Sequence, residues 1–197
     1  MSQSGNFIGF ALFIAADAYF DQALKAEEHI VVRRWFLFGL ISLLSLTLSA
    51  YAADWKQQKY TADGFQVEFS GATSVTDTDI SPETKKLVVR STNYLQDGGT
   101  YAYIASATLY KNGANIVKGS EASFATGKCK TKTQTDIAAS VAGAKGLSFV
   151  GSDCDQGRRW EARYFVKGKW FYQALAIFSA DGDTDSARHF LDSFKLL

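Results

Sequence analysis

Both cysteines of the sequence, Cys129 and Cys154, have basic residues beside them. In an oxidising compartment an even pair of cysteines favours one disulfide, with two free buried thiols as the alternative. A bond that closes a loop of about 25 residues should stabilise the fold by roughly 3 kcal/mol. It would also gather five positive charges that could hold an anionic ligand, a lipid headgroup or an acidic partner. These charges belong to Lys128, Lys130, Lys132, Arg158 and Arg159.

The alternation of the three lysines also has a simpler interpretation. Residues that alternate in this way share one face of a β-strand. An exposed edge strand often carries lysines because their charge prevents pairing with other chains. The basic residues are therefore either a binding patch or a solvated edge.

Residues that could support catalysis are few. Residues 53–197 contain one histidine, His189, which we expect to face solvent on a helix. A nucleophile needs a base beside it, so no catalytic residue is assigned. A hydrolase that uses paired carboxylates is the enzymatic alternative, with Glu68, Glu121 and Glu161 as candidates. One histidine and two distant cysteines do not predict a metal site, and no cofactor is expected.

Alternating aspartates at 181, 183 and 185, followed by Asp192, imitate a calcium-binding loop. The position that needs glycine for the sharp turn is Ser186, and Asp192 would fall inside a predicted helix. We therefore interpret Asp183 and Asp185 as the acidic start of that helix, where negative charge is favourable.

Aromatic residues are numerous enough to line a ligand groove, although strand aromatics more often pack in the core. The candidates are Tyr101, Tyr103, Tyr110, Trp160, Tyr164, Trp170 and Tyr172. A carrier of a small apolar ligand would need a cavity between a sheet and its helices. This carrier is a further alternative.

Residues 33–52 have the three parts of a secretory signal peptide. Arg33 and Arg34 precede the apolar run 35–48, and small residues then place the cleavage between Ala52 and Ala53. The run is shorter than the roughly 20 residues that span a bilayer. We expect a periplasmic or secreted protein with no permanent membrane anchor after cleavage. An uncleaved anchor and export by the twin-arginine route remain alternatives.

A signal peptide belongs at the N-terminus, yet 32 residues precede this one. Val31 and Val32 can both be encoded by GTG, an alternative initiator, and the codons of Glu27 and Glu28 form a purine-rich stretch. We therefore expect residues 1–32 to be an untranslated or spurious extension. Residues 53–197 then form the mature chain, with no linker that would indicate a second domain.

The mature chain carries 18 Lys and Arg against 16 Asp and Glu, a net charge of +2. This balance gives no reason to propose a nucleic-acid partner.

The elements that would position these residues are mainly strands. Alternation predicts a strand over 64–69, and glycine-containing turns at 96–99 and 167–169 predict two hairpins. The hairpin strands are 87–95 with 100–110 and 160–166 with 170–178, and a short strand covers 147–150. Helices are predicted over 136–145 and around the apolar stripe Ala187, Phe190, Leu191 and Phe194. The expected fold is α+β, an antiparallel sheet of about five strands with two or more helices packed on it.

Three segments resemble the small exported bacterial proteins of the PsbP-like α/β/α sandwich type. They are residues 64–71, the run Trp170-Phe171-Tyr172-Gln173 and residues 187–194. The resemblance spans most of residues 60–197 and implies a non-enzymatic accessory or binding role. We therefore predict an exported, non-catalytic binding or accessory domain, whose partner is an unknown protein or an anionic ligand in the cell envelope. A small periplasmic hydrolase or an apolar-ligand carrier is the alternative.

Overall fold

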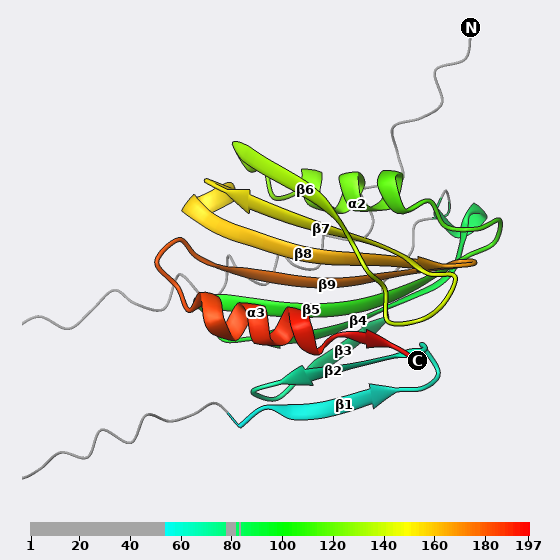
Figure 1. The fold of residues 1–197 in the computed structure, drawn as a ribbon, viewed down its shortest axis with the longest axis horizontal. Coiled ribbons are helices and arrows are strands. Elements are labelled where there is room, and N and C mark those ends of the chain that lie inside the picture. Colours follow the sequence, from blue (N-terminus) through cyan, green and yellow to red (C-terminus); the bar gives the residue numbers. More distant parts are fainter. Residues whose placement is uncertain (1–53, 78–81, 83) are drawn as a thin grey trace, which may run out of the picture.

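The computed structural model describes residues 54–77, 82 and 84–197 (Figure 1). The predicted signal peptide 33–52, its cleavage site at Ala52 and Ala53, and the extension 1–32 lie outside the described residues. In the described part of the chain, no helix is long and apolar enough to cross a bilayer.

A seven-stranded antiparallel sheet forms the centre of the molecule, in the order β3-β4-β5-β9-β8-β7-β6. Its two middle hairpins are β4–β5 and β8–β9, and the predicted hairpin at each place is confirmed. The strands are β3 (Ser74–Asp77), β4 (Val88–Asp97), β5 (Tyr101–Tyr110), β6 (Thr131–Ile137), β7 (Lys145–Ser152), β8 (Arg158–Lys167) and β9 (Trp170–Ser179).

One face of this sheet, called here the α3 side, is covered by a small sheet and a helix (Figure 1). The small sheet has the order β1-β2-β10, with β1 (Lys56–Tyr60), β2 (Phe65–Phe69) and β10 (Lys195–Leu196). The helix is α3 (Thr184–Ser193), which begins at the N-cap Asp183. Its predicted apolar stripe is confirmed, because Ala187, Phe190 and Leu191 are buried.

The other face, called here the α2 side, is covered over β7 and β8 by α2 (Ile116–Ala125). Asn115 caps this helix, since its side chain accepts a hydrogen bond from the backbone N–H of Lys118 at 3.0 Å. Two short 3-10 helices, Thr84–Lys86 and Asp155–Gly157, complete the described elements.

The prediction of an α+β fold with about five strands is wrong. The described residues form ten strands in two sheets and two α-helices, so the structure is mostly β. The strands β1, β3 and β10 were not predicted, while β6, which contains Lys132, matches the exposed edge strand given as the simpler interpretation of the lysines. Apart from Leu196, the side chains of these four strands are exposed or half-buried. Each lies at the edge of its sheet, where hydrogen bonds to a neighbouring strand stabilise it and no apolar alternation is needed.

The predicted helix over 136–145 is also wrong. Residues 131–137 are β6, which pairs with β7, and β7 begins at Lys145. Between these strands the chain packs Ala139, Val141 and Ala144 against the core on the α3 side. The segment between β6 and β7 has no regular secondary structure, and its small apolar residues pack against the core.

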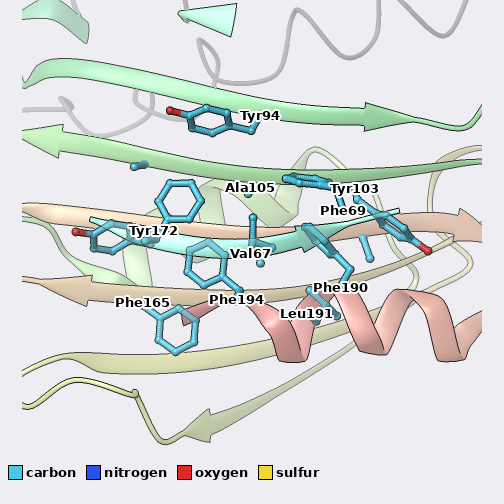
Figure 2. Packing of buried hydrophobic residues seen from close by; sticks show 14 of the residues in the cluster. Val67, Phe69, Tyr94, Tyr103, Ala105, Phe165, Tyr172, Phe190, Leu191 and Phe194 are labelled. Atoms are coloured by element: carbon cyan, nitrogen blue, oxygen red, sulfur yellow. The ribbon is translucent and has the colours of Figure 1, made fainter. Parts of the chain in front are cut away.

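The core on the α3 side consists largely of aromatic rings (Figure 2). Phe65, Val67 and Phe69 point from β2 toward the large sheet and are at most 1% exposed. Phe190 of α3 stacks on Tyr103 of β5 with ring centroids 4.9 Å apart. These contacts fix β2 and α3 relative to the sheet.

Candidate functional site

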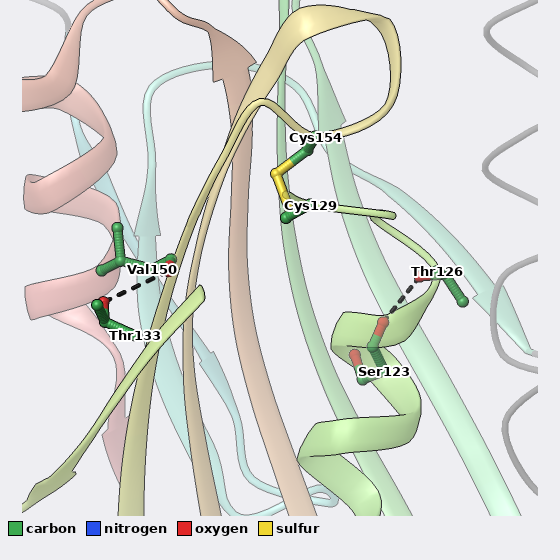
Figure 3. The surroundings of a disulfide bond; sticks show 6 residues. All are labelled: Ser123, Thr126, Cys129, Thr133, Val150 and Cys154. Carbon is green, nitrogen blue, oxygen red and sulfur yellow. Dashed lines mark hydrogen bonds between the residues drawn. A yellow bond between two sulfur atoms is a disulfide. The ribbon is translucent and has the colours of Figure 1, made fainter. Parts of the chain in front are cut away.

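The predicted disulfide is present and joins the loop after α2 to the loop after β7 (Figure 3). Cys129 and Cys154 have Cα atoms 3.7 Å apart. Two backbone hydrogen bonds support the same junction, from the N–H of Asp155 to the carbonyl of Gly127 at 2.7 Å and from the N–H of Lys130 to the carbonyl of Asp153 at 3.3 Å. The two loops that carry the basic residues are thus held together at one end of the sheet.

The predicted basic residues lie at this end but do not share one face. Lys132 lies on the α2 side, with Nζ 5.6 Å from the ring centroid of Phe149. Strand alternation puts Arg158 on the same side as the buried Trp160, and Arg159 on the α3 side opposite Phe178. The five residues therefore surround this end of the sheet. We call them the basic rim: Lys128, Lys130, Lys132, Arg158 and Arg159.

Acidic residues partly neutralise this rim. Lys130, whose side chain is 80% exposed, has Nζ 3.8 Å from a carboxylate oxygen of Asp153. Arg159 donates from Nε to Glu161 at 2.7 Å. The pair of Lys130 with Asp153 is exposed, and pairs of this kind contribute little to stability, so Lys130 can exchange its partner for a ligand at small cost. Glu161 is only 18% exposed, so Arg159 keeps this pair and offers a ligand its remaining guanidinium N–H groups.

A hollow of about 190 Å³ opens at the same end of the sheet, on the α3 side. It lies between the starts of β5 and α3 and the end of β9. Three aromatic residues, five hydroxyl-bearing or small residues and one carboxylate line it: Tyr101, Tyr103, Phe178, Ser70, Thr100, Ser179, Ser186, Gly182 and Asp183. Tyr101 and Tyr103 were among the aromatic residues predicted to line a groove, but no pattern in the sequence indicated this hollow.

Hydrogen bonds hold the walls of the hollow in place. The buried side chain of Gln96 donates to the hydroxyls of Ser70 at 2.9 Å and Tyr101 at 3.0 Å. Its carbonyl oxygen accepts from the backbone N–H of Ser70 at 3.0 Å. Burial raises the pKa of the Tyr103 hydroxyl above its ordinary value of 10.

Asp183 contributes the carboxylate of the hollow. Its Oδ1 accepts from the backbone N–H groups of Asp185 and Ser186, each at 3.0 Å, and Oδ2 accepts from the Ser186 hydroxyl at 2.6 Å. The hydrogen bonds from Ser186 are the main reason that the pKa of Asp183 is lowered. The interpretation of this residue as an acidic helix start is confirmed.

A histidine–carboxylate pair lies on the surface near the hollow and was missed. His189 Nε2 lies 2.7 Å from Oε2 of Glu68, and Trp55 stacks on the imidazole with ring centroids 4.3 Å apart. His189 and Glu68 are 121 residues apart in the sequence, so no local pattern indicates that they pair. Trp55 also lies 6.0 Å from the ring of Tyr103, which links the pair to the hollow.

The three carboxylates of the hydrolase alternative are not brought together. Glu68 lies on β2, Glu121 lies on α2 on the other side of the large sheet, and Glu161 lies on β8 beside Arg159. In the part of the chain that the structure describes, no cluster of three or more histidine, cysteine or acidic side chains could hold a metal ion.

Two buried networks of polar side chains form their hydrogen bonds within the fold. Asp63 in the β1–β2 turn accepts from the Tyr94 hydroxyl at 2.5 Å and pairs with Arg90. On the α2 side the Ser123 hydroxyl donates to Gln173 at 2.7 Å and lies 3.2 Å from the hydroxyl of Tyr164. These bonds fix the turn and the helix, so we assign neither network to ligand binding.

Comparison with known proteins gives no relative to guide the assignment, because no family model and no curated protein matches the chain. The resemblance to PsbP-like proteins stays a prediction. The site must be assigned from its own chemistry.

Proposed function

We propose that the chain is an exported, non-catalytic binding or accessory domain, which holds an anionic ligand or the acidic surface of a protein partner in the cell envelope. The observation that carries this proposal is the disulfide Cys129–Cys154, which fixes the two loops of the basic rim at one end of the sheet. Preorganised charges bind an anion with less loss of conformational freedom than charges on mobile loops.

The disulfide also supports export, since such bonds persist in oxidising compartments. Together with the signal-peptide pattern in residues 33–52, it favours a periplasmic or secreted location. Intact-mass analysis of the protein from the cell envelope tests this part. We expect a chain that begins at Ala53 and contains no free thiol. A chain that begins at Met1, or a reduced cysteine pair, would contradict it.

The two alternatives have weaker support. Paired carboxylates must lie about 5–9 Å apart in one cleft to hydrolyse a glycoside, whereas Glu68 and Glu121 lie on opposite sides of the sheet. An apolar-ligand carrier needs space between the sheet and its covering layer. On the α3 side aromatic side chains such as Phe69, Tyr103 and Phe190 occupy this layer (Figure 2).

Charge reversal at the basic rim tests the binding function. We expect Lys130→Glu with Arg158→Glu to weaken binding to vesicles of anionic phospholipid, or to an acidic envelope partner recovered by crosslinking, by at least about tenfold at low salt. The matched control is Lys56→Glu with Lys195→Glu, which reverses two exposed charges on the small sheet. Equal binding by the rim variant and the control would overturn the proposal.

A further inference from the structure

The size of the hollow restricts what it can hold. Pockets for drug-sized ligands usually measure about 300–1,000 Å³, and this one measures about 190 Å³. It can therefore accept one terminal group of a ligand and leaves the rest of that ligand outside. The remainder would lie on the neighbouring surface of the sheet end.

The charge in the hollow favours a cation. Asp183 is the one charged residue among the described residues that line it. This carboxylate also accepts hydrogen bonds from two N–H groups in the first turn of α3, those of Asp185 and Ser186. An anion would thus meet a carboxylate where a helix start ordinarily offers donors, whereas a cation would be attracted to it.

One aromatic side chain in the wall favours the same kind of group. The half-buried ring of Tyr101 lines the hollow and packs on Tyr103 with ring centroids 4.8 Å apart, while Tyr103 and Phe178 are only 3% and 2% exposed. The negative face of an aromatic ring attracts organic ammonium groups. The hydrogen bond from Gln96 to the Tyr101 hydroxyl restricts this ring in advance of binding.

The hollow adjoins the basic rim. Arg159 of β8 is the direct cross-strand neighbour of Phe178 on β9, and both side chains are on the α3 side. Neighbouring strands lie about 4.8 Å apart, so one small molecule can reach from Phe178 to the guanidinium. The whole side chain of Arg159 is 39% exposed.

We propose that the hollow binds the ammonium group of a small zwitterionic ligand, whose phosphate or carboxylate contacts Arg159 and the basic rim. This inference rests on the proposed function, because it assigns the anionic half of the ligand to the same rim. A phosphate ester of an amino alcohol has the required chemistry, whether it is free in solution or forms the headgroup of a lipid.

Four probes test the two halves of the site separately. Calorimetric titrations of the disulfide-bonded chain would use phosphocholine, tetramethylammonium, inorganic phosphate and 3,3-dimethyl-1-butanol, the uncharged analogue of choline. We expect phosphocholine to bind at least about tenfold more tightly than phosphate, and tetramethylammonium to bind more tightly than the alcohol. Equal binding of the alcohol and tetramethylammonium would show that the hollow recognises shape without charge, and would overturn the inference.

Asp183→Asn removes the charge while it preserves the fold, since asparagine caps helices about as well as aspartate. We expect this variant to lose about tenfold in affinity for phosphocholine and tetramethylammonium and to keep its affinity for phosphate. The matched control is Asp185→Asn, which removes an exposed carboxylate outside the lining of the hollow. Equal losses in the two variants, or no loss in Asp183→Asn, would contradict the assignment.

The failure of this inference can be separated from the failure of the proposed function. If phosphate binds but phosphocholine binds no more tightly, the rim is an anion site and the hollow assignment is wrong. If tetramethylammonium binds but phosphate does not, the hollow assignment holds and the anionic function is wrong. Vesicles of phosphatidylcholine then identify the source, because a lipid headgroup ligand predicts binding to vesicles as well as to free phosphocholine.

Discussion

On its α3 side the seven-stranded sheet buries large aromatic rings from five strands and a helix, with Gln96 among a few buried polar groups, whereas its α2 side buries more hydroxyl and amide groups. Phe190 and Phe194 exemplify the first side, and Ser106, Thr108 and Gln173 the second. Rings gain stability from the apolar area they remove from water. Buried hydroxyl and amide groups instead cost stability unless each finds a partner.

The disulfide lies on the more polar α2 side. The layer there is one helix of ten residues, and Ser120, Ser123 and Phe124 are its buried side chains. A single large apolar residue gives this helix little apolar area to bury. Hydrogen bonds from Ser123 and the cross-link at Cys129 therefore supplement its packing.

The largest effect is expected on the α3 side. Phe190→Ala should lower the free energy of unfolding by about 3–5 kcal/mol, because it leaves a cavity between Tyr103 and Phe69. Urea unfolding would measure this loss. Phe190→Leu, which keeps most of the volume, should lose less than half as much. Equal losses would contradict the view that ring packing stabilises this side.

Removal of the cross-link tests the α2 side. Cys129→Ala with Cys154→Ala should cost about 3 kcal/mol, through the entropy of the 25-residue loop. Hydrogen exchange should show the larger loss of protection in α2 and the β6–β7 hairpin, with β2 and α3 less affected. A uniform loss across both sides would show that the two faces unfold as one unit.

The smallest of the three substitutions removes a hydroxyl. Ser123→Ala leaves the carbonyl oxygen of Gln173 without its serine donor, and should cost about 1–2 kcal/mol. Ser74→Ala on the exposed strand β3 is the control and should cost less than about 0.5 kcal/mol. A loss no greater than that of the control would show that the polar network does not hold α2.

High pH should weaken both sides. Burial raises the pKa of Tyr164 on the α2 side, and it raises the pKa of Tyr172 on the α3 side to about 12. The unfolded chain, with an ordinary value of 10, loses these protons first, so stability declines as the pH rises from 10 through 12. Unfolding curves at each pH would measure this decline. Tyr164→Phe and Tyr172→Phe should each flatten it, and an unchanged slope in both would contradict the assignment.

Local patterns in the sequence predicted the central hairpins and the terminal helix, because these elements have strong turn signals and regular apolar spacing. The helix α2 was missed, since Ile116, Val117, Gly119 and Ser120 have weak helix propensity and give no clear apolar stripe. Residues 136–145 gave the opposite error, because an alanine-rich segment has helix propensity wherever the fold places it. Tertiary packing overrides propensity at both places.

Only those parts of the candidate site that lie close together in the sequence could be predicted. The disulfide and its basic neighbours follow from residue types close to each cysteine. The hollow and the pair of Glu68 with His189 depend on how β2, β5, β9 and α3 pack together. No local spacing encodes such long-range contacts.

The pairing of β10 with β2 has a consequence for when the domain can fold. Lys195 pairs with Gln66, so the small sheet cannot close until nearly the whole described chain has been synthesised. Contacts between such distant residues form slowly. The finished fold is therefore reached only after the last strand is available to pair with β2.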